Sequence, residues 1–190
     1  MSDTPGPSAA LDPSCDLIRC IVLVGFMGSG KSTVGYALAA SLGWGFLDLD
    51  AVIATAAGKS IPELFKEEGE EAFRARESDA LAAILAQAEL ERQVLAVGGG
   101  GFVPKRNREM LQNGKALTVF LDHPLDLMWK RCREAVTERP LARDYDSFQR
   151  LYFDRLPIYE MAHLRVSTAG KLPKEIVGVI QDWLRASQPS

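Results

Sequence analysis

The sequence predicts an α/β fold in which helices cover both faces of a five-stranded parallel sheet. Three observations lead to this prediction. Short apolar runs alternate with longer segments of helical spacing along most of the chain. The first apolar run, residues 20–24, is apolar throughout, as expected for a strand that is buried on both faces. A glycine-rich turn and a helical segment follow it at once, and this order of strand, loop and helix is typical of parallel sheets.

The first half of the chain is expected to contain two strands and two helical segments. The first strand covers residues 19–24, and the first helix covers residues 32–42 and is closed by a glycine. A second short strand is expected at residues 45–49. A long helical tract then covers residues 61–92 and breaks at Gly69, since glycine is a poor helix former.

The second half continues the alternation of strands and helices. Residues 93–97 form a short buried strand, and Pro104 follows at the first position of a helix, where its missing N–H costs nothing. Two more strands are expected at residues 116–121 and 164–167. Residues 134–146 are charged and lack periodicity, which indicates a mobile loop. The remaining expected helices are residues 125–133, 147–162 and 173–186.

Composition and charge limit the classes of function. The chain has 190 residues, 47% of them hydrophobic, which suffices for one core; we expect one domain over residues 18–190 after a disordered tail, residues 1–17. Its 22 basic and 25 acidic residues give a formal net charge of −3, so no global positive field favours nucleic acid. The three cysteines have no metal-ligand spacing, and we expect them to be reduced.

The hydropathy pattern predicts no membrane segment. No apolar run approaches the roughly 20 residues that span a bilayer. The N-terminus has neither the apolar core of a signal peptide nor the Arg-rich character of a transit peptide. We therefore expect a cytoplasmic protein without a membrane partner, and we expect it to be a monomer.

Residues 25–32 carry the strongest functional motif. They read Gly-Phe-Met-Gly-Ser-Gly-Lys-Ser, which fits the phosphate-binding pattern GxxxxGK[S/T], and they lie between a predicted strand and a predicted helix. Glycines let backbone N–H groups converge on phosphate oxygens, and the helix adds its positive N-terminal end. The alternative is a glycine-rich turn without function. The nucleotide-binding residues predicted here are Gly28, Ser29, Gly30, Lys31, Ser32 and Thr33.

The chemistry of a nucleoside triphosphate suggests individual roles within this motif. Lys31 is expected at the β- and γ-phosphates, Ser32 at Mg²⁺ and Thr33 at the α-phosphate. The chain has no Asn-Lys pair, with which GTPases begin the segment that reads guanine, so adenine is favoured. The sequence thus predicts an ATP and Mg²⁺ site in a three-layer P-loop sandwich.

Asp48 and Asp50 stand at the end of the second predicted strand. Ligands of open parallel sheets bind beyond such strand ends. In a strand, side chains two residues apart point the same way. One carboxylate could then hold Mg²⁺, directly or through water, while the other takes the proton of a substrate hydroxyl. The alternatives are a solvated acidic turn, or Asp50 as the N-cap of a helix.

Gly98, Gly99 and Gly100 close another predicted strand. Three consecutive glycines indicate a backbone that something approaches closely, such as a γ-phosphate or a bound polyol. The alternative is a flexible loop without a ligand.

Together these motifs resemble the shikimate kinases, a family of the nucleoside-monophosphate-kinase-like P-loop group, over about residues 21–162. The resemblance implies transfer of the γ-phosphate of ATP to the 3-hydroxyl of shikimate, a step of aromatic amino acid biosynthesis. It also implies a mobile lid over about residues 134–146. Besides the phosphate loop, the matching segments are FLDLD at 46–50, FRARE at 73–77, GGG at 98–100, RPL at 139–141 and RLPIYEMA at 155–162.

The resemblance implies roles for residues on the substrate side. Asp48 would contact magnesium, and Asp50 would contact the substrate hydroxyl. Arg74, steadied by Glu77, and Arg155 would bind the substrate carboxylate. Arginine forks bind carboxylates through paired hydrogen bonds that lysine cannot copy, which would explain selection of an acid.

The resemblance further implies that the glycine triplet, residues 98–100, lies against the substrate, with Gly99 closest to it. Arg139 would close with the lid over the transferring phosphate. The arginine that stacks on adenine falls at either Arg131 or Arg133, and the spacing to the lid leaves this open. The catalytic residues implied are Lys31, Asp50 and Arg139.

Two other functions remain as alternatives. One is another small-molecule kinase of the same architecture, such as a gluconate or nucleoside-monophosphate kinase. The other is a nucleotide-binding module without turnover, because a fold and a phosphate loop do not prove catalysis.

Overall fold

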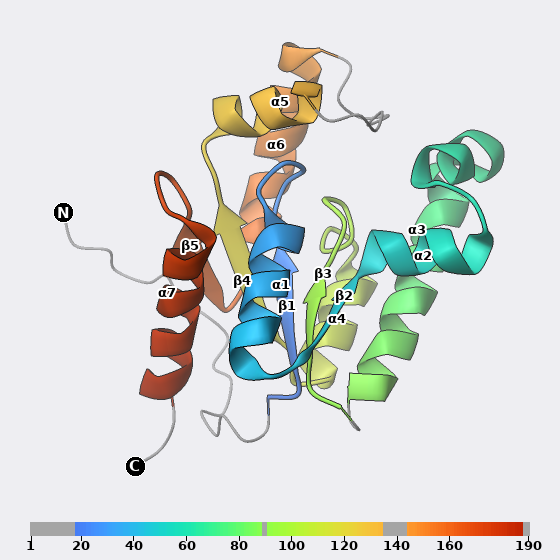
Figure 1. Cartoon of the computed structure of the whole chain (residues 1–190). Helices are drawn as coiled ribbons and strands as arrows, with labels where there is room; N and C mark the ends of the chain where they lie inside the picture. The colour runs from blue at the N-terminus through green and yellow to red at the C-terminus, as the bar shows by residue number, and fades with distance from the viewer. Residues whose placement is uncertain (1–17, 89–90, 135–143, 188–190) are drawn as a thin grey trace.

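The computed structural model describes residues 18–88, 91–134 and 144–187, and in this part the predicted five-stranded parallel sheet is confirmed (Figure 1). Its strand order is β2-β3-β1-β4-β5, and every neighbouring pair is parallel. The strands that follow β1 in the chain lie first on one side of it (β2 and β3) and then on the other (β4 and β5), so the strand order reverses at β1. Ligands are expected at the carboxyl end of a strand where this happens. The strands are β1 (Cys20–Val24), β2 (Gly45–Asp48), β3 (Gln93–Ala96), β4 (Leu117–Asp122) and β5 (Leu164–Ser167).

Helices cover the sheet on both faces, which gives the three predicted layers (Figure 1). The helices α1 and α7 lie against each other on one face, while α2 to α6 pack on the other. They are α1 (Lys31–Leu42), α2 (Leu49–Ala57), α3 (Ile61–Ala88), α4 (Lys105–Asn113), α5 (Leu125–Glu134), α6 (Tyr145–Tyr159) and α7 (Pro173–Ala186).

The strand β1 is buried on both of its faces, as its apolar run predicts. Alternate side chains pack into the two separate apolar clusters: Val22 joins the cluster under α2 to α6, and Leu23 joins the cluster under α1 and α7. Both side chains have no exposed surface. The phosphate loop therefore starts from the most enclosed strand of the sheet.

Three expectations about helices were wrong. The helix α2 was not foreseen, because it follows β2 without a turn and Asp48 serves both as the last strand residue and as the helix N-cap. Pro104 is the N-cap of α4 and not its first helical residue. The tract predicted over residues 61–92 ends at Ala88, whereas its break at Gly69 is confirmed by a φ of 82°.

Both ends of the predicted loop over residues 134–146 are helical. Glu134 is the last residue of α5, and α6 starts at Tyr145 because the Asp144 carboxylate accepts a hydrogen bond from the Ser147 N–H as its N-cap. Residues 135–143, with Arg139 among them, lie outside the described residues, and so does the predicted tail.

The two described cysteines, Cys20 and Cys132, are buried and form no disulfide, in agreement with the expectation of reduced thiols. Burial raises the pKa of the Cys20 thiol to about 12, which keeps it protonated and unreactive. Cys15 lies in the tail outside the described residues. No helix of the described part is long and apolar enough to cross a membrane.

The packing of α1 on the sheet makes a stability prediction. Leu38 is fully buried between α1 and the sheet, whereas Leu127 on α5 is 46% exposed. Leu38→Ala should lower the free energy of unfolding by about 2–5 kcal/mol, because it leaves a cavity in a packed core. The matched variant Leu127→Ala should change it by less than about 0.5 kcal/mol. Urea unfolding of both variants measures the difference, and equal losses would contradict this packing.

Candidate active site

The phosphate-loop motif joins β1 to α1 with a backbone that only glycine adopts readily. Gly25, Gly28 and Gly30 have φ values of 142°, 81° and 91°. A Cβ at Gly28 would lie 2.8 Å from the Met128 carbonyl oxygen, so this turn also has no room for a side chain. Gly30 is the N-cap of α1 and brings no side chain to the first turn, which leaves backbone N–H groups available for an anion.

The ammonium group of Lys31 lies against the same loop. Its Nζ donates hydrogen bonds to the carbonyl oxygens of Gly25 and Phe26, each at 2.9 Å. The Ser29 hydroxyl lies 3.4 Å away and accepts a third, longer bond. A positive charge thus lies within the turn whose N–H groups favour phosphate.

Asp48 connects the phosphate loop to α2. Its Oδ2 accepts a hydrogen bond from the Ser32 hydroxyl at 2.6 Å, and its Oδ1 accepts one from the Asp50 N–H at 3.1 Å. The second bond is the N-cap of α2, so Asp50 lies in the first helical turn. Both the expectation of two carboxylates on one strand and the alternative of Asp50 as the cap were therefore wrong. Both residues nevertheless line one cavity.

Other residues closely approach the three consecutive glycines after β3, which argues against the alternative of a flexible loop. A Cβ at Gly98 would lie 2.6 Å from Asp50 Oδ1, and one at Gly99 would lie 3.2 Å from the Met27 nitrogen. A Cβ at Gly100 would overlap the guanidinium group of Arg74. A side chain at any of the three positions would therefore have to displace a neighbour.

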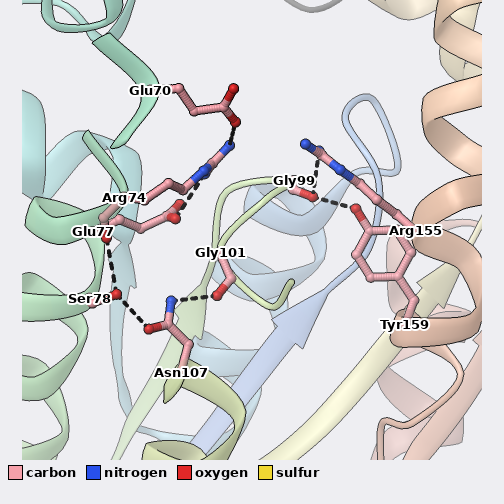
Figure 2. A network of polar contacts seen from close by, with 9 residues as sticks. All are labelled: Glu70, Arg74, Glu77, Ser78, Gly99, Gly101, Asn107, Arg155 and Tyr159. Carbon is pink, nitrogen blue, oxygen red and sulfur yellow. Dashed lines mark hydrogen bonds and ion pairs between the residues drawn. The ribbon is translucent and has the colours of Figure 1, made fainter. Parts of the chain in front are cut away.

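Arg74 projects from α3 toward this loop and is held by carboxylates. Its Nη1 donates to Glu77 Oε2 at 2.8 Å, and its Nη2 donates to Glu70 Oε1 at 3.2 Å (Figure 2). Burial raises the pKa of Glu77 above its ordinary value, and the adjacent Arg74 opposes this shift. Burial also acts against the charge of Arg74, but its two carboxylate partners raise its pKa overall. The guanidinium is therefore fixed in the charged state.

Arg155 reaches the same loop from α6. Its Nη1 donates to the Gly99 carbonyl oxygen at 3.1 Å, and the Tyr159 hydroxyl donates to the same oxygen. Burial raises the pKa of Tyr159 to about 12, so its hydroxyl keeps the proton that it donates. Figure 2 shows the guanidinium groups of Arg74 and Arg155 extending toward each other from opposite sides of the glycine loop.

A cavity of about 400 Å³ opens beside these residues. The phosphate loop, Asp48, Asp50 and the glycines at 98 and 99 contribute to its lining. The lining does not include Arg74, Arg155 or Gly100, which lie on the other side of Gly99. It also includes His123, Arg131, Thr168, Lys171, Pro173 and Ile176.

Of the two arginines left open by the sequence, only Arg131 lines the cavity. Its Nη1 donates to the Gly28 carbonyl oxygen at 3.1 Å, which places it over the phosphate loop. Arg133 instead lies over the ring of Trp129, with its Cζ 5.7 Å from the ring centroid. The two side chains differ because residues two apart on a helix point in nearly opposite directions.

The sequence analysis missed several residues that line the cavity. His123 follows the last residue of β4, and Thr168 follows the last residue of β5. Lys171 lies in the turn before α7, and Pro173 is the first residue of that helix. The rule that ligands bind beyond the carboxyl ends of parallel strands could have found the first two, although no local motif marks them.

Comparison with known proteins identifies the family. A family model described as shikimate kinase matches residues 27–185. A shikimate kinase of Nostoc punctiforme is 43% identical over 164 residues, which cover 84% of this chain and 87% of that protein. One of Persephonella marina is 41% identical over 170 residues, or 88% of this chain and 100% of that protein.

A solved structure leads to the same family. The shikimate kinase of Acinetobacter baumannii in complex with shikimate matches with a TM-score of 0.83 and 33% sequence identity. The match covers 91% of this chain and 96% of that one. With its phosphate loop, its glycine triplet and its parallel sheet, the chain belongs to the shikimate kinase family.

Proposed function

We propose that this chain transfers the γ-phosphate of ATP to the 3-hydroxyl of shikimate, which yields shikimate 3-phosphate and ADP. The observation that carries the proposal is the position of Arg74 and Arg155, which flank Gly99 next to a phosphate loop. Two guanidinium groups held on opposite sides of one loop can both donate paired hydrogen bonds to the carboxylate of a small acid. We further propose that residues 18–190 act as one kinase domain in a cytoplasmic monomer.

The nucleotide would bind along the cavity. The backbone N–H groups of residues 28–33 and the free N-terminus of α1 favour its phosphates, and Lys31 would contribute the compensating charge. The base would lie beside Arg131 and Pro173, which line the same cavity. This assignment makes Arg131, and not Arg133, the arginine that contacts adenine.

The oxygen ligands near the phosphate loop fit Mg²⁺. The Ser32 hydroxyl and the Asp48 carboxylate lie 2.6 Å apart and are the hard donors that this ion prefers. Among the described residues no group of three or more His, Cys, Asp or Glu side chains could hold a metal. Magnesium is usually held by one or two protein oxygens together with phosphates, and when bound it would neutralise charge on the transferring group.

Asp50 and the two arginines would contact different groups of the acceptor. The carboxylate of shikimate would bind between Arg74 and Arg155, so that its ring lies against Gly99. The hydroxyl that reacts would then face Asp50, whose Oδ1 lies next to the Gly98 backbone. Asp50 would orient this hydroxyl and accept its proton as the phosphate is transferred.

Charge and water exclusion would complete the reaction. The transition state of phosphoryl transfer spreads negative charge over the γ-phosphoryl oxygens, and Lys31 is placed to stabilise it. We propose that Arg139 does the same from the lid, residues 134–146. Closure of the lid would exclude water, which would otherwise accept the phosphate in place of shikimate.

The acceptor is tested by a panel of three compounds. ADP formation should depend on shikimate, be much slower with quinate, and stay at the background rate with gluconate. EDTA should abolish it, because the phosphates then lose their counter-ion. Gluconate as the better acceptor would identify a different kinase. ATP binding without acceptor-dependent ADP release would identify a binding module without turnover.

The role of Arg74 predicts that its substitution changes the KM for shikimate much more than the KM for ATP. Arg74→Lys keeps the charge opposite the buried Glu77 but loses the fork, so the KM for shikimate should rise about tenfold or more. The KM for ATP should change by less than about threefold. Arg76→Lys is the matched control, since Arg76 pairs with Glu68 at the surface of the same helix. An equal rise of both constants in the Arg74 variant would refute the carboxylate role.

The role of Asp50 predicts a loss in turnover. Asp50→Asn has nearly the same shape but cannot accept a proton, so kcat should fall by about 10²–10⁴-fold. The affinity for ATP, measured by direct titration, should stay within about threefold. Asp79→Asn, on the exposed surface of α3, should leave both quantities unchanged. A kcat of the Asp50 variant close to that of the natural enzyme would exclude a base at this position.

A further inference from the structure

His123 is a buried side chain in the cavity wall to which the reaction assigns no role. It follows the last residue of β4, is only 6% exposed, and lines the cavity. Its Nδ1 lies 2.7 Å from the Thr168 hydroxyl oxygen. Its Nε2 is buried and has no hydrogen-bond partner among the described residues.

The contacts of Thr168 determine which ring nitrogen carries the proton. The Thr168 hydroxyl donates to the Asp122 carbonyl oxygen at 3.0 Å. A hydroxyl has one proton and a carbonyl oxygen can only accept, so the same hydroxyl must accept from the histidine. Nδ1–H therefore donates to Thr168 Oγ1. This is the single arrangement in which both hydrogen bonds exist.

Nε2 is consequently an acceptor. Burial and, to a lesser extent, the nearby Arg131 lower the pKa of His123, while Asp122 acts in the opposite direction. The ring is thus neutral near pH 7, and with the proton on Nδ1 its other nitrogen presents a lone pair. A buried acceptor without a donor is costly, and such atoms in native structures require an explanation. A ligand that brings a donor into the cavity supplies one.

The parts of ATP differ in what they can donate. Phosphate oxygens near neutral pH accept hydrogen bonds, so they cannot supply the donor that Nε2 lacks. Adenine carries an amino group with N–H donors, whereas guanine and hypoxanthine have an acceptor oxygen at the same position. Pro173 and Ile176 line the same cavity as His123 and Thr168 and offer apolar walls for a base.

We propose that His123 Nε2 accepts a hydrogen bond from the 6-amino group of adenine, and that this contact makes the site select adenine over 6-oxo purines. Thr168 is the positioning residue that fixes the ring's tautomer. The proposal rests on the proposed function only in taking ATP as the nucleotide. Because it concerns nucleotide binding alone, it is measured without an acceptor and stays separable from the choice of shikimate.

The test compares the affinities of ADP and IDP for the full-length chain by calorimetric titration without shikimate. IDP replaces the amino group by a carbonyl oxygen, whose lone pairs would face those of Nε2. The natural protein should bind ADP at least about tenfold more tightly, the ratio expected for a buried acceptor left unpaired. His123→Leu should reduce this preference to within about threefold. Thr168→Val should reduce it similarly, because Nε2 can then carry the proton and donate to IDP.

A second histidine and threonine pair provides the control. Thr118 Oγ1 lies 2.7 Å from His163 Nδ1, and neither residue lines the cavity. Thr118→Val and His163→Leu should leave the ratio of the two affinities as in the natural protein. Circular dichroism verifies that each variant is folded, and if His123→Leu fails to fold, Thr168→Val decides the question alone.

Two results would overturn the proposal. One is that the natural protein binds ADP and IDP equally, or that His123→Leu and Thr168→Val both keep its preference for ADP over IDP. The other concerns 2′-deoxy-ADP as a third ligand. The natural protein would bind ADP more tightly than 2′-deoxy-ADP, and His123→Leu would remove this preference but keep the preference for ADP over IDP. In that case Nε2 would accept from the ribose and not from the base.

Discussion

The site depends on the absence of side chains in the loop after β3. Asp50, Met27 and Arg74 each approach one of the three glycines so closely that a Cβ would collide with it or crowd it. The loop thereby brings the phosphate side and the acid-binding side into direct contact. A side chain at any of the three positions would press against one of these neighbours, which come from distant stretches of the chain.

Hydrogen bonds to the backbone of the same loop fix its position. The Gly99 carbonyl oxygen accepts from two α6 side chains, and the Gly101 carbonyl oxygen accepts from Asn107 Nδ2 at 2.8 Å (Figure 2). Asn107 Oδ1 in turn accepts from the Ser78 hydroxyl at 2.7 Å, one helical turn beyond Arg74. The loop is thus tied to α3, α4 and α6, which limits how far the two guanidinium groups can move apart.

The sequence predicted those parts of the molecule that local patterns encode. All five strands, the break at Gly69 and the phosphate loop are visible in short segments, because burial and glycine leave a direct signal. The start of α2 was missed because one residue, Asp48, ends a strand and caps a helix at once. Part of the cavity lining was missed because a long stretch of chain separates His123 from Thr168 and Pro173, and the sheet brings them together. Whether Arg131 or Arg133 faces the cavity depends on helix rotation, which packing decides.

The buried phenol of Tyr159 has a consequence for the chemistry of the whole centre. Since it ionises only near pH 12, its bond to Gly99 persists under any acidity that a living cell experiences. This contact between α6 and the glycine loop therefore does not change with pH in that range. An alkaline decline in rate below pH 10 would have to originate in groups that titrate earlier, and not in loss of this contact.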